Sequence, residues 1–216
     1  SYGSVLFDSG NNPFKIERIA FYLSGFSLTG SKAAELRVKD QLSFEAETAP
    51  GRLTERLITD DIIYVDPGDL GTLTLGTIIG EGNYEQLGLR LGLPEETSGL
   101  VLSTLPDGHS LEMQIDTSNL NQEGDYVVFR IDYFPDTTQN TRLETVAFSA
   151  QELSLNLDFE LPFFLPRGSK VGLIWTMDYS AWLEQINFKV QDNVQIKEQI
   201  RSNLAEAFTL SAVSIQ

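Results

Sequence analysis

The stretch LSLNLDFEL, residues 153–161, decides the fold because apolar and polar residues alternate along its whole length. The apolar positions are Leu153, Leu155, Leu157, Phe159 and Leu161. Successive side chains of a strand point to opposite faces, so this pattern predicts a strand with one face in the core and one in water. Half-buried strands of this kind are typical of antiparallel sheets, whereas parallel strands are buried on both faces.

The same alternation recurs in EQLGLRLGL, residues 85–93, and in DYVVFRIDYF, residues 125–134. Further strands are expected at residues 15–28, 73–79, 111–115, 140–149 and 170–177, with glycine- and proline-rich turns between them. Many short strands separated by turns indicate an all-β fold. The sequence therefore predicts an antiparallel β-sandwich, or an open barrel.

Helical periodicity is confined to the end of the chain. Ile196, Ile200, Leu204 and Phe208 recur every four residues after a cap at Asp192 or Asn193. We expect one short C-terminal helix, followed by a final short strand at residues 209–215. The 216 residues fit one β domain spanning 1–216, because sandwiches and barrels often reach this size as a single unit.

The charge balance excludes several classes of partner. Fifteen Lys and Arg against 31 Asp and Glu give a formal net charge of −16, which repels phosphate backbones and anionic lipid surfaces. No nucleic-acid partner is expected. No apolar run approaches the roughly 18–20 residues that cross a bilayer, so no transmembrane segment is expected. Because no signal-peptide pattern opens the sequence, we expect either a cytosolic protein or a mature or trimmed form of an exported one.

Catalytic motifs are missing from the sequence. It contains no cysteine, one histidine, and none of the P-loop, G-x-S-x-G or H-E-x-x-H motifs. We therefore predict that the protein is not an enzyme. The pairs Asp60–Asp61 and Glu95–Glu96 leave three interpretations open: solvated surface carboxylates, calcium ligands, or the acid and base of a glycosidase.

Two clusters are candidate binding residues. The segment GLIWTMDYSAW, residues 172–182, gathers Trp175, Tyr179 and Trp182, which would form either a ligand platform or a stripe of core aromatics. The second cluster combines His109, Met113 and Met177, because imidazole and thioether ligands suit Cu(I). This copper site requires that the three side chains converge in the fold.

Taken in order, several segments resemble the MbnP family of extracytoplasmic copper-binding β proteins. Residues 15–28 are similar to the family's early tyrosine-rich strand. Residues 75–99, LGTIIGEGNYEQLGLRLGLPEETSG, are similar to its next segment, and GDYVVFRIDY, residues 124–133, to its G-Y strand. IRSNLAEAFTLSAV, residues 200–213, resembles its closing segment. The matching positions are Gly76, Ile78, Gly82, Tyr84, Leu87, Leu91, Gly92, Gly124, Tyr126, Phe129, Ile200, Asn203 and Phe208.

The resemblance implies export to the periplasm or cell surface. It also implies copper as the ligand, held by histidines and an oxidised tryptophan, and a di-haem peroxidase-like partner that performs the oxidation. Where the family carries M-x-W-x-W, this chain has LEMQID, residues 111–116, with Met113 in the methionine position and no tryptophan. We interpret the chain as a divergent member whose copper site is lost or altered.

Two functional hypotheses follow, beside the glycosidase interpretation of the carboxylate pairs. The first is a non-enzymatic extracytoplasmic binding protein, with copper as its ligand if His109, Met113 and Met177 converge. The second is a structural or adhesive cell-surface module that binds a glycan or a protein partner.

Overall fold

The computed structural model describes residues 4–30, 35–66, 68, 73–112, 126–137 and 142–215. Its strands are β1 (Val5–Phe7), β2 (Pro13–Thr29), β3 (Leu36–Arg37), β4 (Gln41–Ala49), β5 (Arg52–Thr59), β6 (Ile63–Val65), β7 (Gly82–Leu91), β8 (Val127–Phe134), β9 (Glu144–Ser149), β10 (Leu155–Leu165), β11 (Val171–Met177) and β12 (Phe208–Ile215). Its helices are α1 (Tyr179–Trp182) and α2 (Asn193–Asn203), with 3₁₀ turns η1 (Glu95–Thr97), η2 (Leu102–Thr104), η3 (Ser110–Glu112) and η4 (Leu204–Ala207).

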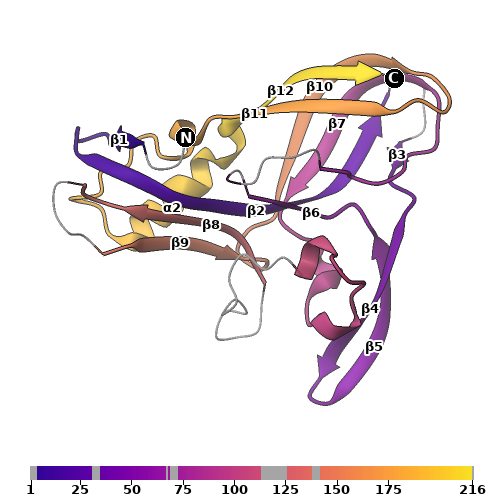
Figure 1. Cartoon of the computed structure of the whole chain (residues 1–216), viewed down its shortest axis with the longest axis horizontal. Coiled ribbons are helices and arrows are strands. Elements are labelled where there is room, and N and C mark those ends of the chain that lie inside the picture. Colours follow the sequence, from indigo (N-terminus) through magenta and orange to yellow (C-terminus); the bar gives the residue numbers. More distant parts are fainter. Residues whose placement is uncertain are drawn as a thin grey trace. The chain divides into compact units, whose positions relative to one another are not determined.

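The strands form one large sheet and two ribbons (Figure 1). The large sheet runs in the order β10–β7–β2–β8–β9, and β1, β3 and β6 also pair with β2. The ribbons are β4–β5 and β11–β12. All strand pairs with a defined register are antiparallel. This arrangement confirms the predicted fold class, an antiparallel β architecture with one short C-terminal helix.

The chain divides into two compact units. Unit 1 comprises residues 1–19, 130–147 and 170–216, and unit 2 comprises residues 20–129 and 148–169. Strands β2, β8 and β9 contribute residues to both units. The single domain expected from the sequence stays a prediction. No helix within the described ranges is long and apolar enough to cross a membrane.

Unit 2 is built around the alternation seen in the sequence. Leu87, Leu89 and Leu91 of β7 are buried, and Leu157 of β10 is buried beside them, paired with Leu89. Between these positions Asn156 and Asp158 are exposed. The period of two therefore predicted both the strands and their buried face correctly.

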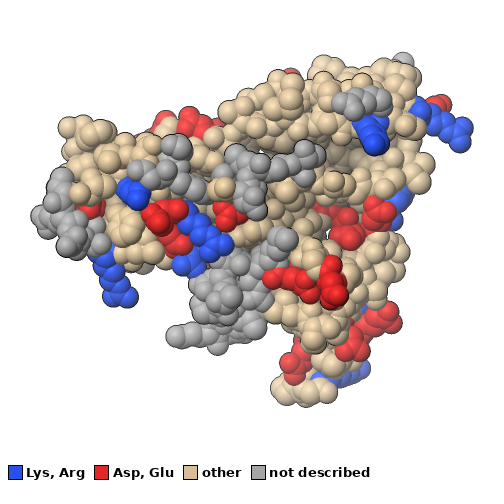
Figure 2. Space-filling model, viewed as in Figure 1, with Lys and Arg blue, Asp and Glu red and all other residues tan. Residues whose placement is uncertain are grey.

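The β4–β5 hairpin of unit 2 was missed by the sequence analysis. Leu42, Phe44 and Ala46 are buried and alternate with exposed residues, which is the same signal that identified the other strands. The hairpin turns at Gly51, which stands at φ +73°, a conformation that glycine adopts without steric cost. Its surface carries many of the acidic side chains visible in Figure 2.

The strand predicted at residues 73–79 is wrong. This segment forms no strand, and Ile78 makes only an isolated bridge to Val38. Gly76 lies at φ +112°, which interrupts an extended backbone in the middle of the segment. Of the strand predicted at 111–115, Leu111 and Glu112 lie in η3, and the rest lies outside the described residues.

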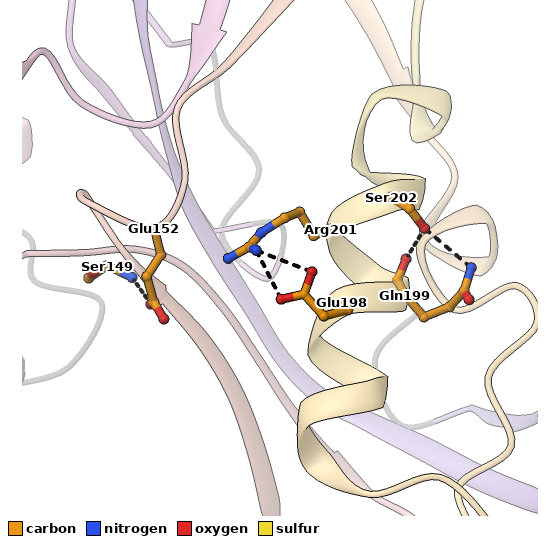
Figure 3. A network of polar contacts seen from close by, with 6 residues as sticks. All are labelled: Ser149, Glu152, Glu198, Gln199, Arg201 and Ser202. Carbon is orange, nitrogen blue, oxygen red and sulfur yellow. Dashed lines mark hydrogen bonds and ion pairs between the residues drawn. The ribbon is translucent and has the colours of Figure 1, made fainter.

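The helix of unit 1 begins where the sequence predicted. Asp192 caps α2 by accepting a hydrogen bond from the Gln195 N–H, and the Gln195 side chain accepts one from the Asp192 N–H. This reciprocal pair is a capping box. Figure 3 shows the polar side of α2, where Glu198 and Arg201 form an ion pair at 2.9 Å. The same figure shows a separate contact of unit 2, in which the Glu152 side chain accepts a hydrogen bond from the Ser149 N–H.

The opposite side of α2 is apolar and faces the interior of unit 1. Ile196, Ile200 and Leu204 are buried, and Phe208 follows them at the start of β12. The final strand predicted at residues 209–215 is confirmed as β12, which pairs with β11.

An N-terminal loop is fastened within unit 1 by the Asp8 carboxylate. Asp8 accepts hydrogen bonds from the backbone N–H groups of Gly10, Asn12 and Phe188, and from the Asn12 side chain. Burial alone would raise the pKa of Asp8, but the donors outweigh burial and hold that pKa below its usual value. The carboxylate therefore stabilises the folded loop in its ionised form.

Candidate functional site

The only histidine lies in a tight loop of unit 2, just before η3. Gly108, at φ +76°, allows the turn, and its N–H donates to the Glu112 carboxylate at 2.6 Å. The His109 N–H donates to the Pro106 carbonyl, and the Glu112 N–H donates to the His109 carbonyl. The His109 side chain is 9 % exposed. The backbone of the loop therefore fixes the position of the ring.

Both ring nitrogens of His109 have partners. Nδ1 accepts a hydrogen bond from the Leu111 N–H at 3.1 Å, so Nδ1 presents its lone pair. In the neutral ring the proton then sits on Nε2, which lies 3.0 Å from Oδ1 of Asp60 and donates to it. A metal ion could bind this imidazole only by displacing one of these two partners.

The neighbouring carboxylate, Asp61, is buried, with 4 % of its surface exposed. It accepts a hydrogen bond from the Phe26 N–H at 2.7 Å, at a bulge in β2 where Gly25 takes φ +67°. Burial raises the pKa of Asp61, although hydrogen bonds from the backbone of Gly25 and Phe26 oppose that rise. The Asp60–Asp61 pair thus joins the His109 loop to β2, which the sequence interpretation as a solvated pair did not foresee.

The proposed copper ligands are not brought together by the described structure. His109 lies in unit 2, Met177 ends β11 in unit 1, and Met113 lies outside the described residues. Within the described ranges no group of three His, Asp or Glu side chains could hold a metal ion.

Glu95 and Glu96 lie in η1, where the Glu96 carbonyl accepts from Arg56 at 2.7 Å. Copper and calcium binding stay predictions.

The aromatic segment divides between core and surface. Trp182 is 0 % exposed, its indole N–H donates to the Leu204 carbonyl at 3.2 Å, and its ring lies 5.7 Å from that of Phe208. This environment makes Trp182 a core residue of unit 1. Trp175 and Tyr179 are partly exposed, so a ligand platform made by these two residues stays a prediction.

A second polar site was not found from the sequence. On one face of β7, Arg90 pairs in register with Ser24 of β2 and Asn156 of β10, and Gly88 pairs with Ser27 and Asp158. We call Ser27, Gly88, Arg90, Asn156 and Asp158 the Arg90 face; Ser24 is buried and donates to the Gly92 carbonyl. Two bulges interrupt the pairing of these strands with β7. One lies in β2 between Ser24 and Ser27, and the other lies in β10 between Glu160 and Phe163.

The side chains of the Arg90 face have no partners within the described ranges. Among the described residues, the side chains of Ser27, Arg90, Asn156 and Asp158 make no hydrogen bond or ion pair with one another or with other residues. Arg90 is half-buried, and its Nε is a buried donor without an acceptor. Leaving such a donor unsatisfied costs about 1–3 kcal/mol, so the fold retains Arg90 at a cost to its own stability.

Gly88 lies at the centre of this face. A Cβ on Gly88 would stand 2.8 Å from Oγ of Ser27 and 3.3 Å from Oδ1 of Asp158. The hydroxyl and the carboxylate therefore converge over a position without a side chain. The signal in the sequence was the pair of glycines in LGLRLGL, since glycine inside a strand often marks a close approach of a ligand or of another backbone.

Comparisons with known proteins give one distant likeness. No family model and no curated protein matches the chain. Among solved structures, the chain is similar to MbnP from Methylosinus trichosporium, with a TM-score of 0.40 and 15 % sequence identity, over 80 % of this chain and 69 % of that chain. The relationship is a distant one in structure only, and the site residues above rest on their own geometry.

Proposed function

We propose that this chain is a non-enzymatic extracytoplasmic binding protein of the MbnP-like type whose copper site is altered. One observation carries the copper part of the proposal: the only imidazole of the chain already uses Nδ1 and Nε2 for Leu111 and Asp60. A copper site built on His109 would have to break one of those bonds, and the family's tryptophans are replaced at the corresponding positions. The ring therefore supports the loop instead of a metal.

Titration with Cu(I) in competition with a chelator tests this proposal. We expect no binding tighter than micromolar, and the same weak binding in the His109→Ala and Met177→Ala variants. Tight binding that disappears in His109→Ala would refute the altered-site proposal and restore copper as the ligand. Met113→Ala tests the third predicted ligand in the same titration.

Localisation and the di-haem partner follow from the resemblance and are tested separately. We propose that the protein resides in the periplasm or at the cell surface, which fractionation of the producing cells would show. Since the chain lacks the family's tryptophan motif, we expect intact-mass measurement to find Trp175 and Trp182 unmodified. An oxidised tryptophan would instead support a di-haem peroxidase-like partner.

The alternative function, a structural or adhesive module, is favoured by the Arg90 face. Polar side chains without internal partners retain their capacity to bind an external molecule. Self-association on a sizing column, or capture of a glycan, would support this alternative. A monomer that binds neither a glycan nor a protein would refute it.

A further inference from the structure

We propose that the Arg90 face binds a neutral polyhydroxylated ligand, a glycan. This inference deepens the proposed binding function and rests on it. The face combines one guanidinium, one carboxylate, one amide and one hydroxyl from three adjacent strands. None of them is hydrogen-bonded to another described side chain or backbone group, and the Nε of Arg90 is in addition buried. Together they offer both donors and acceptors to a single ligand.

The charges of the face select the class of ligand. A cation bound by Asp158 would be repelled by Arg90. Asp158 pairs with Gly88, and Arg90 lies two residues further along β7, on the same face. An anion bound by Arg90 would be repelled by Asp158 in the same way. A hydroxyl group avoids both conflicts because its oxygen accepts from the guanidinium while its hydrogen donates to the carboxylate. Glu160, in register with Gln86, adds a second carboxylate to the same face and repels an anion further. With Arg90 disfavouring a cation, the arrangement favours a neutral ligand with several hydroxyls over a metal ion or a phosphate.

The backbone at Gly88 allows a close approach. Ser27 and Asp158 lie on either side of this residue, and a Cβ there would stand 2.8 Å from the Ser27 hydroxyl, which would have to rotate away. Glycine in a strand interior is otherwise unfavourable, because it contributes no packing and loses more conformational entropy on folding than other residues. A ligand hydroxyl placed above Gly88 would reach both Ser27 and Asp158.

An aromatic pair extends the same face. Alternation along β7 places Tyr84 on the side of Gly88 and Arg90, about 13 Å from Gly88 at 3.3 Å per residue. Phe163 of β10 pairs with Tyr84, the two ring centroids lying 6.0 Å apart, and Phe163 is half-buried. Tyr84 is buried, with 2 % of its surface exposed, so only the half-buried Phe163 ring is available to the apolar face of a second sugar unit, which favours an oligosaccharide over a monosaccharide.

Glycan-array binding followed by affinity measurement with the bound glycan tests this inference. We expect the full chain to bind a neutral oligosaccharide, and Arg90→Met and Gly88→Ala each to weaken that binding at least tenfold. The matched control is Arg167→Met, which removes an exposed guanidinium outside the face and should leave the affinity unchanged. Urea unfolding of each variant shows whether it is folded, and Asp158→Asn provides a second variant with little effect on packing.

The outcomes separate this inference from the proposed function. Weakened binding in the variants at 88, 90 and 158, with Arg167→Met unaffected, supports the glycan site. Stronger binding in Asp158→Asn overturns it in favour of an anionic ligand. The inference is also overturned if none of the three variants weakens glycan binding, or if the unmodified chain binds no glycan. The binding function itself fails only if no protein partner is bound either.

Discussion

Two polar regions of unit 2, the His109 loop and the Arg90 face, differ in how their hydrogen-bonding groups are satisfied. In the His109 loop, both ring nitrogens and the neighbouring carboxylates have partners within the protein. On the Arg90 face, a half-buried arginine and three polar neighbours have none among the described residues. The loop resembles a structural polar network, and the face resembles a binding site.

This difference shows that residue type alone misleads in this chain. A lone histidine beside carboxylates suggests metal or acid–base chemistry, yet its contacts are those of a residue that stabilises a turn. Arginine and asparagine on a strand look like an ordinary solvated face, yet the arginine is half-buried and has no partner in the part of the chain that the structure describes. Satisfied groups contribute to stability, and unsatisfied groups are available to a ligand.

The largest change in the free energy of unfolding, and the strongest test of the contrast between the two sites, is expected at His109. His109→Ala removes the acceptor of the buried Leu111 N–H and the donor to Asp60, so we expect a loss of about 2–3 kcal/mol in the free energy of unfolding. His109→Asn should recover part of this loss, because the amide oxygen can replace Nδ1. Urea denaturation measures both variants, and a loss below about 0.5 kcal/mol for alanine would show that the loop is not structural.

A smaller, pH-dependent effect is expected at Asp61. Burial raises the pKa of this carboxyl in the folded state, so its contribution to stability is present below the ordinary value of 3.8 and is lost as the pH rises through the folded pKa. Asp61→Asn cannot ionise and still accepts from Phe26. We therefore expect the variant to gain stability relative to the unmodified chain as the pH rises from 4 to 8.

Asp8 serves as a control, because its contribution to stability should change with pH in the opposite direction to that of Asp61. Its folded pKa is lowered, so its contribution is present above 3.8 and is lost as the pH falls through the folded pKa. Asp8→Asn should therefore be less stable than the unmodified chain at neutral pH, and the deficit should shrink in acid. If both aspartates gave the same sign in urea unfolding at several pH values, the assignment of their environments would be wrong.

The smallest effect on stability is expected at Arg90, although its effect on binding would be the largest. Arg90→Met removes an unsatisfied buried donor and keeps the length of the side chain, so stability should stay unchanged or rise by up to about 1 kcal/mol. Thermal and urea unfolding measure this change. A loss of more than about 2 kcal/mol would show that Arg90 has a structural role, and the contrast with His109 would disappear.

Local patterns predicted much of the fold. The alternation at 85–93 and 153–161 identified β7 and β10 with their buried faces, and the four-residue spacing after Asp192 identified α2. These signals succeed because the period of a strand or helix is a property of consecutive residues. The expected strand at 73–79 failed because apolar composition does not provide a pairing partner, and Gly76 breaks the extended backbone.

The two polar sites could not be predicted in the same way. Asp60 and His109 are 49 positions apart in the sequence, and their contact depends on how η3 packs beside β6. Ser27, Gly88 and Asp158 come from three strands, and two bulges shift their register by one residue each. A shift of one residue exchanges the two faces of a strand, so no pattern within one segment could show which side chains meet.

The sequence by itself determined the all-β class, the buried faces of the main strands, the capped C-terminal helix and the shortage of imidazole and thiolate ligands, because each depends on composition or on the spacing of neighbouring residues. The tertiary structure alone decided which polar groups are satisfied. It engaged both nitrogens of His109 and left Arg90 without a partner among the described residues, because hydrogen bonding between distant segments depends on strand register and not on residue type.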